Sequence, residues 1–564
     1  MSDQTAPDRP DPEGGGNPID TEFEMGQDNV EGTVGRVPFD IHNPVFMISA
    51  ISVMAFVFFA LVFDVQAGAF FNGVDASDTC EAGAFCDLGL RSFLTSNFDW
   101  FFLSSANIFV IFCLFLIISP YGAVRLGGVD AKPDYTYLGW FAMLFAAGMG
   151  IGLMFFGVLE PVYYFGTPWG DEPLGVVRPF AEDGSLIPEN VDAARRMALA
   201  ATSYHWALHP WAIYAVVALA LALFTYNKGL PLTIRSAFYP ILGERVWGWW
   251  GHIIDTLAVF ATLFGLATSL GFGAQQANAG LEYVYGIPNN ITVQVLLITG
   301  ITLVALVSVW RGLDGGVKVL SEINMGIACL LLLFVLFAAG AATILGNFVM
   351  GIGAYFQEVI PLSNPFGRED DGYRQGWTAF YWAWWISWSP FVGMFIARVS
   401  RGRTVREFVI CVLLIPSLVC VLWMAVFGGS AIEQVIANPD ASAVKAQVID
   451  SYNPPLSLFA MLSELPFAAI TSTIGIILVI VFFVTSSDSG SLVIDTITAG
   501  GKIDAPLPQR VFWCTFEGAV AIVLLIGGGL TALQAMVIST GLPFTVILLL
   551  MCWAIFKGLR NEPR

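Results

Sequence analysis

Long apolar segments follow one another along nearly the whole chain, separated by short polar or charged stretches. A run of about 20 apolar residues is long enough to cross a bilayer as a helix. The runs are continuous rather than alternating, which excludes a β-barrel, and backbone groups in lipid must be satisfied within the segment. The pattern therefore predicts an all-α polytopic membrane protein with twelve transmembrane helices. The predicted spans are 45–65, 100–121, 136–158, 196–224, 250–274, 288–310, 322–347, 376–398, 405–428, 467–487, 510–529 and 534–556.

Composition supports this class and locates the excess charge. The 564 residues are 56% hydrophobic and 12% charged, whereas a soluble protein carries about 25% charged residues. The net charge of −19 comes partly from a segment, Met1 to Gly35, with nine acidic residues against Arg9. Such a segment is too polar to fold alone. We expect a disordered acidic tail over 1–40, a membrane domain over 41–557 and a short tail over 558–564.

Positive charges set the expected orientation. With the N-terminus inside, the inner segments hold sixteen Lys and Arg residues and the outer loops seven. This asymmetry predicts that both termini are cytoplasmic in a bacterial inner membrane. An outer loop would then hold Cys80 and Cys86, either bridged or as two free thiols.

The chain lacks the usual signatures of an enzyme. It has no phosphate-binding loop, no metal-ligand spacing and no soluble domain, and nothing indicates a nucleic-acid partner. A membrane-embedded enzyme would have to rely on Asp255, Glu322 and Asp488, which fall on separate spans. A channel is the other alternative, and it would conduct without saturation. We therefore expect a transporter that uses no cofactor and is not an enzyme.

Aromatic residues gather in two spans. Trp377, Tyr381, Trp385 and Trp388 recur at helical spacing in the eighth span, and His205, Trp206, His209, Trp211 and Tyr214 lie in the fourth. Trp often lies at membrane interfaces. Facing rings inside a span would instead form a cage that attracts a quaternary ammonium or sulfonium group by cation–π interaction.

Two further motifs suggest where ions could bind. Gly148-Met149-Gly150-Ile151-Gly152 weakens a helix, either for close helix packing or to expose backbone groups to a cavity. Thr485, Ser486, Ser487 and Ser489 beside Asp488 offer oxygen ligands. Hydroxyls in a helix can equally bond to their own backbone, but an intramembrane acid favours a functional role.

These residues resemble the betaine/carnitine/choline transporter family. The resemblance runs from about Pro44 to Trp553, and its most specific part is the stretch WAWWISWSPFVGMF, which begins at Trp382. GMGIGLMFFG and HWALHPWAIY add to it. The resemblance implies a LeuT-type fold with inverted five-helix repeats, spans three to seven (about 136–347) and eight to twelve (about 376–557). It also implies a homotrimer.

The resemblance also assigns site residues. For the aromatic box it implies Trp206, Trp211, Tyr214 and Trp385, and Trp384 and Trp388 would line the pathway. Backbone near Gly150 and Gly152 would meet the substrate carboxylate. For a sodium site it implies backbone oxygens of Ala146, Met149 and Phe482 with the Thr485 and Ser486 side chains. A second sodium site would use Thr262 and Phe391, but Leu266 replaces a family hydroxyl there.

The resemblance narrows the substrate to a zwitterion. Choline-selective relatives tend to carry Asp where this chain has Gly152, and a desolvated cation needs such a counterion. We therefore expect Na⁺-coupled uptake of glycine betaine or dimethylsulfoniopropionate. Sodium-independent exchange of carnitine-like substrates and choline uptake are the alternatives on the same fold.

Overall fold

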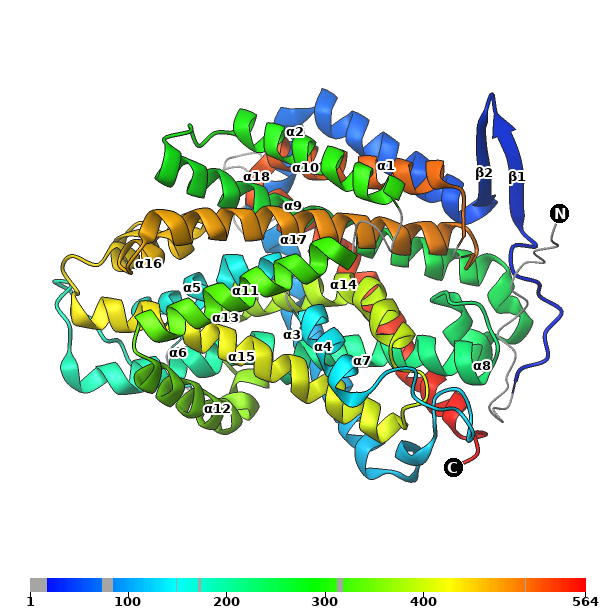
Figure 1. The fold of residues 1–564 in the computed structure, drawn as a ribbon, viewed down its shortest axis with the longest axis horizontal. Coiled ribbons are helices and arrows are strands. Elements are labelled where there is room, and N and C mark those ends of the chain that lie inside the picture. Colours follow the sequence, from blue (N-terminus) through cyan, green and yellow to red (C-terminus); the bar gives the residue numbers. More distant parts are fainter. Residues whose placement is uncertain (1–17, 74–84, 149, 171–173, 312–317, 503) are drawn as a thin grey trace.

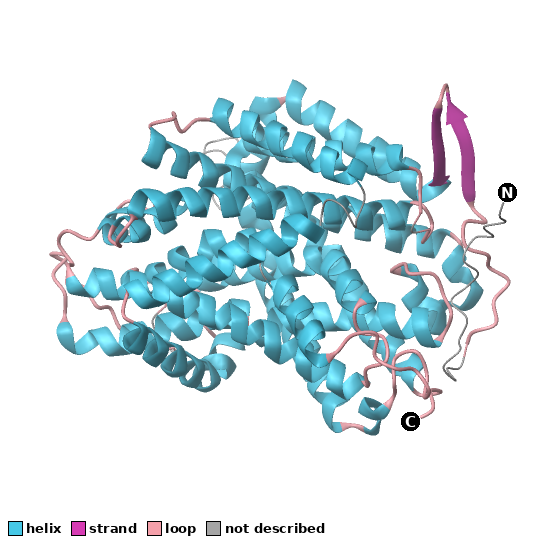
Figure 2. Ribbon diagram, viewed as in Figure 1, coloured by secondary structure: helices cyan, strands magenta, loops and turns pink. Residues whose placement is uncertain are grey.

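The chain folds into a bundle of long helices with one small β-hairpin at its edge (Figures 1 and 2). The structure is a computed structural model that describes residues 18–73, 85–148, 150–170, 174–311, 318–502 and 504–564. Its strands are β1 (Asn29–Val34) and β2 (Val37–His42). Its α-helices are α1 (Asn43–Val62), α2 (Asp64–Asn72), α3 (Phe85–Ile118), α4 (Tyr137–Gly148), α5 (Ile151–Gly166), α6 (Val191–Trp206), α7 (Leu208–Ala222), α8 (Tyr239–Leu242), α9 (Trp249–Tyr285), α10 (Ile291–Arg311), α11 (Lys318–Ala338), α12 (Ala341–Ser363), α13 (Asp371–Tyr373), α14 (Ala379–Arg398), α15 (Val405–Ala437), α16 (Ser457–Ser463), α17 (Ala468–Thr498) and α18 (Leu507–Leu559).

The length and composition of these helices confirm a polytopic membrane protein. Within the described residues, nine helices are long and apolar enough to cross a membrane, or ten if the bent pair α4 and α5 counts as one span. Helix α14 is outside this set because its Trp, Tyr, Ser and Pro residues lower its mean hydropathy. Nevertheless α14 is central, because it packs against α7, α9 and α18 and most of its side chains are buried.

Two predicted spans are interrupted and one long helix is kinked, and each irregularity has a local cause. Between α4 and α5 the axis bends by 68° next to the glycine motif. Between α6 and α7 the backbone leaves helical geometry at Ala207, three residues before Pro210. Proline lacks a backbone N–H and disturbs a helix least in its first turn, and Pro210 stands in the first turn of α7. Helix α18 is kinked at Gly528 and Gly529, between the eleventh and twelfth predicted spans.

The seventh predicted span, 322–347, is wrong at its end. Helix α11 stops at Ala338, and α12 begins at Ala341 as a separate helix. The break lies at Gly340, whose φ of 98° is a left-handed conformation that ends helices readily at glycine.

The prediction of a disordered tail over 1–40 is also wrong for its second half, because β1 and β2 form a hairpin there. Asp40 bonds to Lys502 Nζ at 2.6 Å, and its backbone pairs with the side chain of Gln509. The Asn29 amide donates to Ala499 O at 2.9 Å. These partners lie more than 450 residues away in sequence, so local composition could not predict them.

The two ends of the described chain meet at one end of the bundle. Ile19 N donates to Lys228 O at 3.0 Å, and the Lys228 side chain is ion-paired with Glu562. Residues 558–564 are thus held against the protein. At the N-terminal end of α3, Cys86 is disulfide-bonded. Its predicted partner, Cys80, lies outside the described residues.

Candidate functional site

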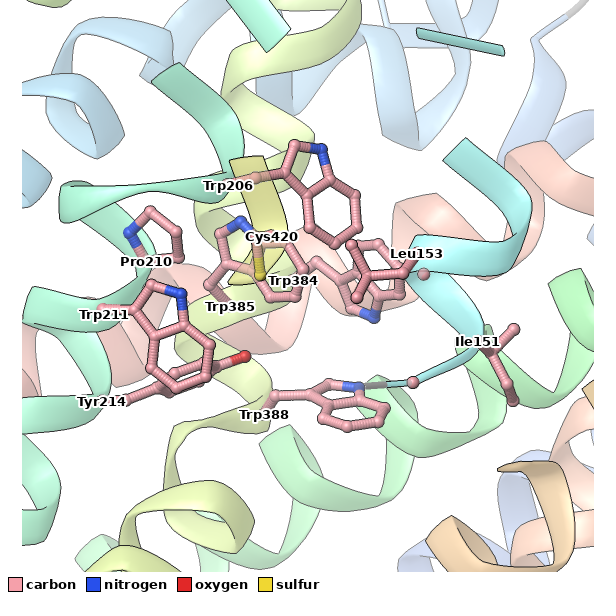
Figure 3. Close-up of a pocket in the computed structure, with 12 residues that line it drawn as sticks. Ile151, Leu153, Trp206, Pro210, Trp211, Tyr214, Trp384, Trp385, Trp388 and Cys420 are labelled. Atoms are coloured by element: carbon pink, nitrogen blue, oxygen red, sulfur yellow. The ribbon is translucent and has the colours of Figure 1, made fainter. Parts of the chain in front are cut away.

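All eight residues predicted to bind substrate line one cavity of about 470 Å³. It lies where the broken helices α5, α6 and α7 meet α14 (Figure 3). The remaining lining residues are mostly apolar, and among the described residues that line the cavity none is acidic. The lining residues are Gly150, Ile151, Gly152, Leu153, Trp206, Pro210, Trp211, Tyr214, Trp384, Trp385, Trp388 and Cys420.

The rings form a continuous aromatic wall around this cavity. Trp385 stacks on Trp384 with centroids 4.9 Å apart and meets Trp206 edge-on at 5.0 Å. Trp211 meets Tyr214 edge-on at 5.3 Å, and Tyr214 lies 6.2 Å from Trp385. Figure 3 shows these rings on different sides of one space. Such a set of faces and edges can surround an onium group.

The indole N–H groups hold the rings in place from outside the cavity. Trp385 Nε1 donates to His205 O at 3.0 Å. From α9, Ser269 Oγ accepts from Trp384 Nε1 at 3.2 Å and Gly265 O accepts from Trp388 Nε1 at 2.9 Å. Because the polar edges are satisfied by protein, the carbon rings are left to line the cavity.

Sequence reasoning missed the residue that holds Trp206. Glu160, on α5, is fully buried, and its Oε2 accepts from Trp206 Nε1 and from Tyr381 Oη, each at 2.7 Å. Its Oε1 pairs with His205 Nδ1, and His205 Nε2 lies 2.9 Å from Thr378 Oγ1. One carboxylate thus ties together α5, α6 and α14 directly behind the aromatic wall.

The other end of the cavity is the N-terminus of α5. The chain from Gly150 to Leu153 lines the cavity, and α5 begins at Ile151 after Gly150 in extended conformation. The first N–H groups of a helix have no intrahelical partner and attract anions, aided by the helix dipole. The site therefore presents aromatic rings and the first N–H groups of a helix to the same cavity.

Gly152 is where the helix and the aromatic wall are closest. A Cβ at this position would lie 2.9 Å from Trp206 Cη2 and 3.0 Å from Trp384 Cη2. Any side chain at this position would therefore press on both rings and force them to shift, although alanine favours a helix more.

We expect Gly152→Ala to lower substrate affinity by about tenfold, because overpacking costs about 1–3 kcal/mol and 1.4 kcal/mol is a factor of ten. The KM for uptake measures this. Gly326→Ala in α11, where a Cβ meets nothing within 4 Å, is the control and should leave the KM unchanged. A wild-type KM in Gly152→Ala would mean that the rings move freely.

The structure provides less support for the predicted sodium ligands than for the aromatic cavity. Thr485 and Ser486 are half-buried on α17, and Thr485 Oγ1 donates to Val481 O and Phe482 O, both at 3.1 Å. Ala146 lies at the end of α4, and Met149 lies outside the described residues. The Thr485 hydroxyl therefore makes the backbone contacts that a structural role also predicts, and the sodium site stays a prediction.

At the predicted second sodium site, Thr262 Oγ1 bonds to Ala258 O at 2.8 Å. Leu266 packs against Gly490 of α17, so an apolar side chain fills the place of the family hydroxyl. Phe391 packs edge-on against Trp388, with centroids 5.5 Å apart.

Comparison with known proteins identifies the family. The model of the betaine/carnitine/choline family transporters matches residues 44–564. A glycine betaine/proline/choline transporter of Vibrio parahaemolyticus is 58% identical over 555 residues, which cover 98% of this chain and 96% of the relative. Glycine betaine transporter 1 of the same organism is 55% identical over 545 residues, covering 96% and 97% of the two chains. The glycine betaine transporter OpuD of Bacillus subtilis is 42% identical over 511 residues, covering 90% and 94%. The chain therefore belongs to the betaine/carnitine/choline transporter family, whose members are transporters and not enzymes.

Proposed function

We propose that this protein takes up glycine betaine by Na⁺ symport. The observation that carries the proposal is the single cavity that joins an aromatic cage to a helix N-terminus. A trimethylammonium group fits the rings of Trp206, Trp211, Tyr214 and Trp385, and the carboxylate of the same molecule reaches the N–H groups at the start of α5. The names of the relatives, which are glycine betaine transporters, agree with this assignment.

A zwitterion suits this cavity better than a free cation. Since no acidic side chain is among the described lining residues, a bound cation would be desolvated without a direct counterion. Glycine betaine and dimethylsulfoniopropionate each carry their own carboxylate. Choline uptake is the second candidate, because one relative is named as a transporter of choline as well and Glu160 lies directly behind Trp206.

The same proposal includes the topology that the hydrophobic pattern, the positive charges and the family resemblance predict. Twelve spans result when α4–α5 and α6–α7 count as one each, α18 counts as two, and α1, α3, α9, α10, α11, α14, α15 and α17 complete the set. We place both termini in the cytoplasm of a bacterial inner membrane and assign LeuT-like inverted repeats to about 136–347 and 376–557. The family resemblance also implies a homotrimer, and the mass of the solubilised particle tests this.

Coupling would act through the broken span. Na⁺ bound between backbone oxygens of Ala146, Met149 and Phe482 and the hydroxyls of Thr485 and Ser486 would fix the break before α5 against α17, a helix that α5 contacts. Since α5 also carries the carboxylate-binding N–H groups, ion binding raises substrate affinity, and substrate must raise Na⁺ affinity by the same factor.

The test is uptake of labelled glycine betaine by a strain without its own betaine carriers, with and without Na⁺. We expect saturable uptake that is lost without Na⁺, with unlabelled dimethylsulfoniopropionate competing better than choline or carnitine. Replacing both Thr485 and Ser486 by alanine should raise the half-saturating Na⁺ concentration at least tenfold, since two of five ligands are removed. Thr515→Ala, which removes an exposed hydroxyl bonded to Val511 O, should not. If uptake does not depend on Na⁺, symport is contradicted and sodium-independent exchange becomes the proposed mechanism.

A further inference from the structure

A second group of intramembrane oxygens lies apart from the aromatic cavity, between α10, α17 and α18. These three helices pack against one another (Figure 1). Asp488 lies ten residues before the end of α17 at Thr498, and Glu517 lies ten residues after the start of α18 at Leu507. At about 1.5 Å per residue, both carboxylates are about 15 Å from these adjacent helix ends, or half of an ~30 Å hydrocarbon core.

Four oxygens of this cluster are buried and lie outside hydrogen-bonding geometry. Ser487 and Asp488 are the polar neighbours of Glu517, and Ser308 of α10 is a polar neighbour of Asp488. Among the described residues, both Glu517 oxygens, Asp488 Oδ2 and Ser308 Oγ have no partner within hydrogen-bonding geometry. Glu517 is 0% and Asp488 2% exposed. Buried polar groups are ordinarily paired, so these four atoms require an explanation.

Arg510, on the first turns of α18, does not compensate both acids. Its Nε lies 3.6 Å from Asp495 Oδ2, and it faces Asp488 only at longer range. Asp488, Glu517 and Asp495 against one arginine leave an excess of two negative charges when all are ionised. Two ionised carboxylates without a counterion are costly in a low-dielectric interior, so this pair is neutralised either by protons or by a cation that binds between the helices.

The chemistry of the cluster selects the ligand. Two carboxylates and two hydroxyls, those of Ser308 and Ser487, are hard oxygen donors contributed by three helices. Cys514 is the nearest soft group, and its Sγ lies 3.7 Å from Ser487 Oγ. A serine hydroxyl that faces a carboxylate would normally donate a hydrogen bond to it. If a cation lies between them, both oxygens coordinate the cation instead. Oxygen donors of this kind suit a hard cation, and Na⁺ is the hard cation that the proposed function already requires.

We propose that Asp488, Glu517, Ser308 and Ser487 form a monovalent-cation site that binds Na⁺. This site is separate from the Thr485–Ser486 position, although it lies on the same helix one turn further along α17. Because α10, α17 and α18 come together at the cluster, Na⁺ there holds these three helices together.

The test is equilibrium binding of ²²Na⁺ to purified protein without substrate. Glu517→Gln keeps the shape of the side chain and removes one charge, so it should bind one Na⁺ per chain fewer than wild type. The double alanine variant at Thr485 and Ser486 should retain this ion. Glu322→Gln, which changes an exposed acid on α11, is the matched control and should bind as wild type does. If Glu517→Gln does not fold, Asp488→Asn is the test variant, with the same expected loss of one Na⁺ per chain.

Two outcomes would overturn the site. An unchanged Na⁺ count in both Glu517→Gln and Asp488→Asn would show that no Na⁺ binds there. If lowering the pH changes proton uptake by wild type but not by Glu517→Gln, while the Na⁺ count is equal, the pair holds a proton instead. Because binding is measured without substrate, a failure of Na⁺-driven uptake would contradict the proposed function without affecting this measurement.

Discussion

Replacing Trp385 by leucine should weaken glycine betaine binding by about 30-fold and leave the amount of folded transporter nearly unchanged. Trp385 touches three other rings of the cage: Trp384, Trp206 and Tyr214. A desolvated cation–π contact contributes about 2 kcal/mol, which corresponds to about 30-fold at 1.4 kcal/mol per factor of ten. The KM for uptake and the dissociation constant of the purified protein both measure the effect.

A neighbouring tryptophan provides the control for this substitution. Trp382 lies on the same helix and is also buried, but it packs against Tyr204 and His209 and does not line the cavity. Trp382→Leu removes the same indole where other side chains surround it, so it should lower stability more than Trp385→Leu does, without raising the KM. Trp385→Phe keeps an aromatic face and should lie between wild type and Trp385→Leu. Equal KM values for Trp385→Leu and wild type would remove the cage from the mechanism.

The aromatic groups and the helix breaks were predictable because their signals are local, whereas the choice of lining residues among them came from the family resemblance. Trp385 and Trp388 repeat at helical spacing, and their density in one span is unusual for an interface belt. Glycines mark the break before α5, and the Pro210 that lets α7 restart is itself in the predicted aromatic segment. Each of these features is readable within about ten residues, and together they place rings and free N–H groups on one cavity.

What was missed depends on distant partners. Glu160 is a single acid in a long apolar run, and an intramembrane acid is by default a functional candidate. That signal was available in the sequence. The partners of Glu160, however, come from two other helices: they are His205, Trp206 and Tyr381. Glu517 is hidden in the same way, ten residues into α18. Asp40 and Lys502 are an analogous case at the protein surface.

The second large effect is expected from Glu160, through the geometry of the cage. In Glu160→Ala, the Trp206 N–H, the Tyr381 hydroxyl and His205 lose a common partner. Each unpaired buried group costs about 1–3 kcal/mol, so uptake should fall to a few per cent or less. Glu160→Gln keeps the volume and one acceptor oxygen, and it should fold. We expect it to raise the KM about tenfold with little change in maximal rate, since its amide cannot satisfy all three donors.

The control is Glu433→Gln, which neutralises an acid of α15 paired with Arg195 away from the cavity. It should leave the KM unchanged. If Glu160→Gln also shows a wild-type KM, packing alone positions the rings.

A double-mutant cycle with Trp206→Phe decides whether Glu160 acts through Trp206. Phenylalanine keeps an aromatic face and lacks the N–H that Glu160 accepts. If the carboxylate affects affinity by holding that indole, Glu160→Gln should add little to the KM of Trp206→Phe, and the coupling energy should be about 1 kcal/mol or more, the size found between residues in direct contact. Fully additive effects would instead mean that the negative charge behind the cage attracts the onium group directly. Since Glu160 Oε2 bonds to Trp206 and Tyr381 at the same 2.7 Å, a parallel cycle with Tyr381→Phe should show similar coupling, because both rings depend on one oxygen.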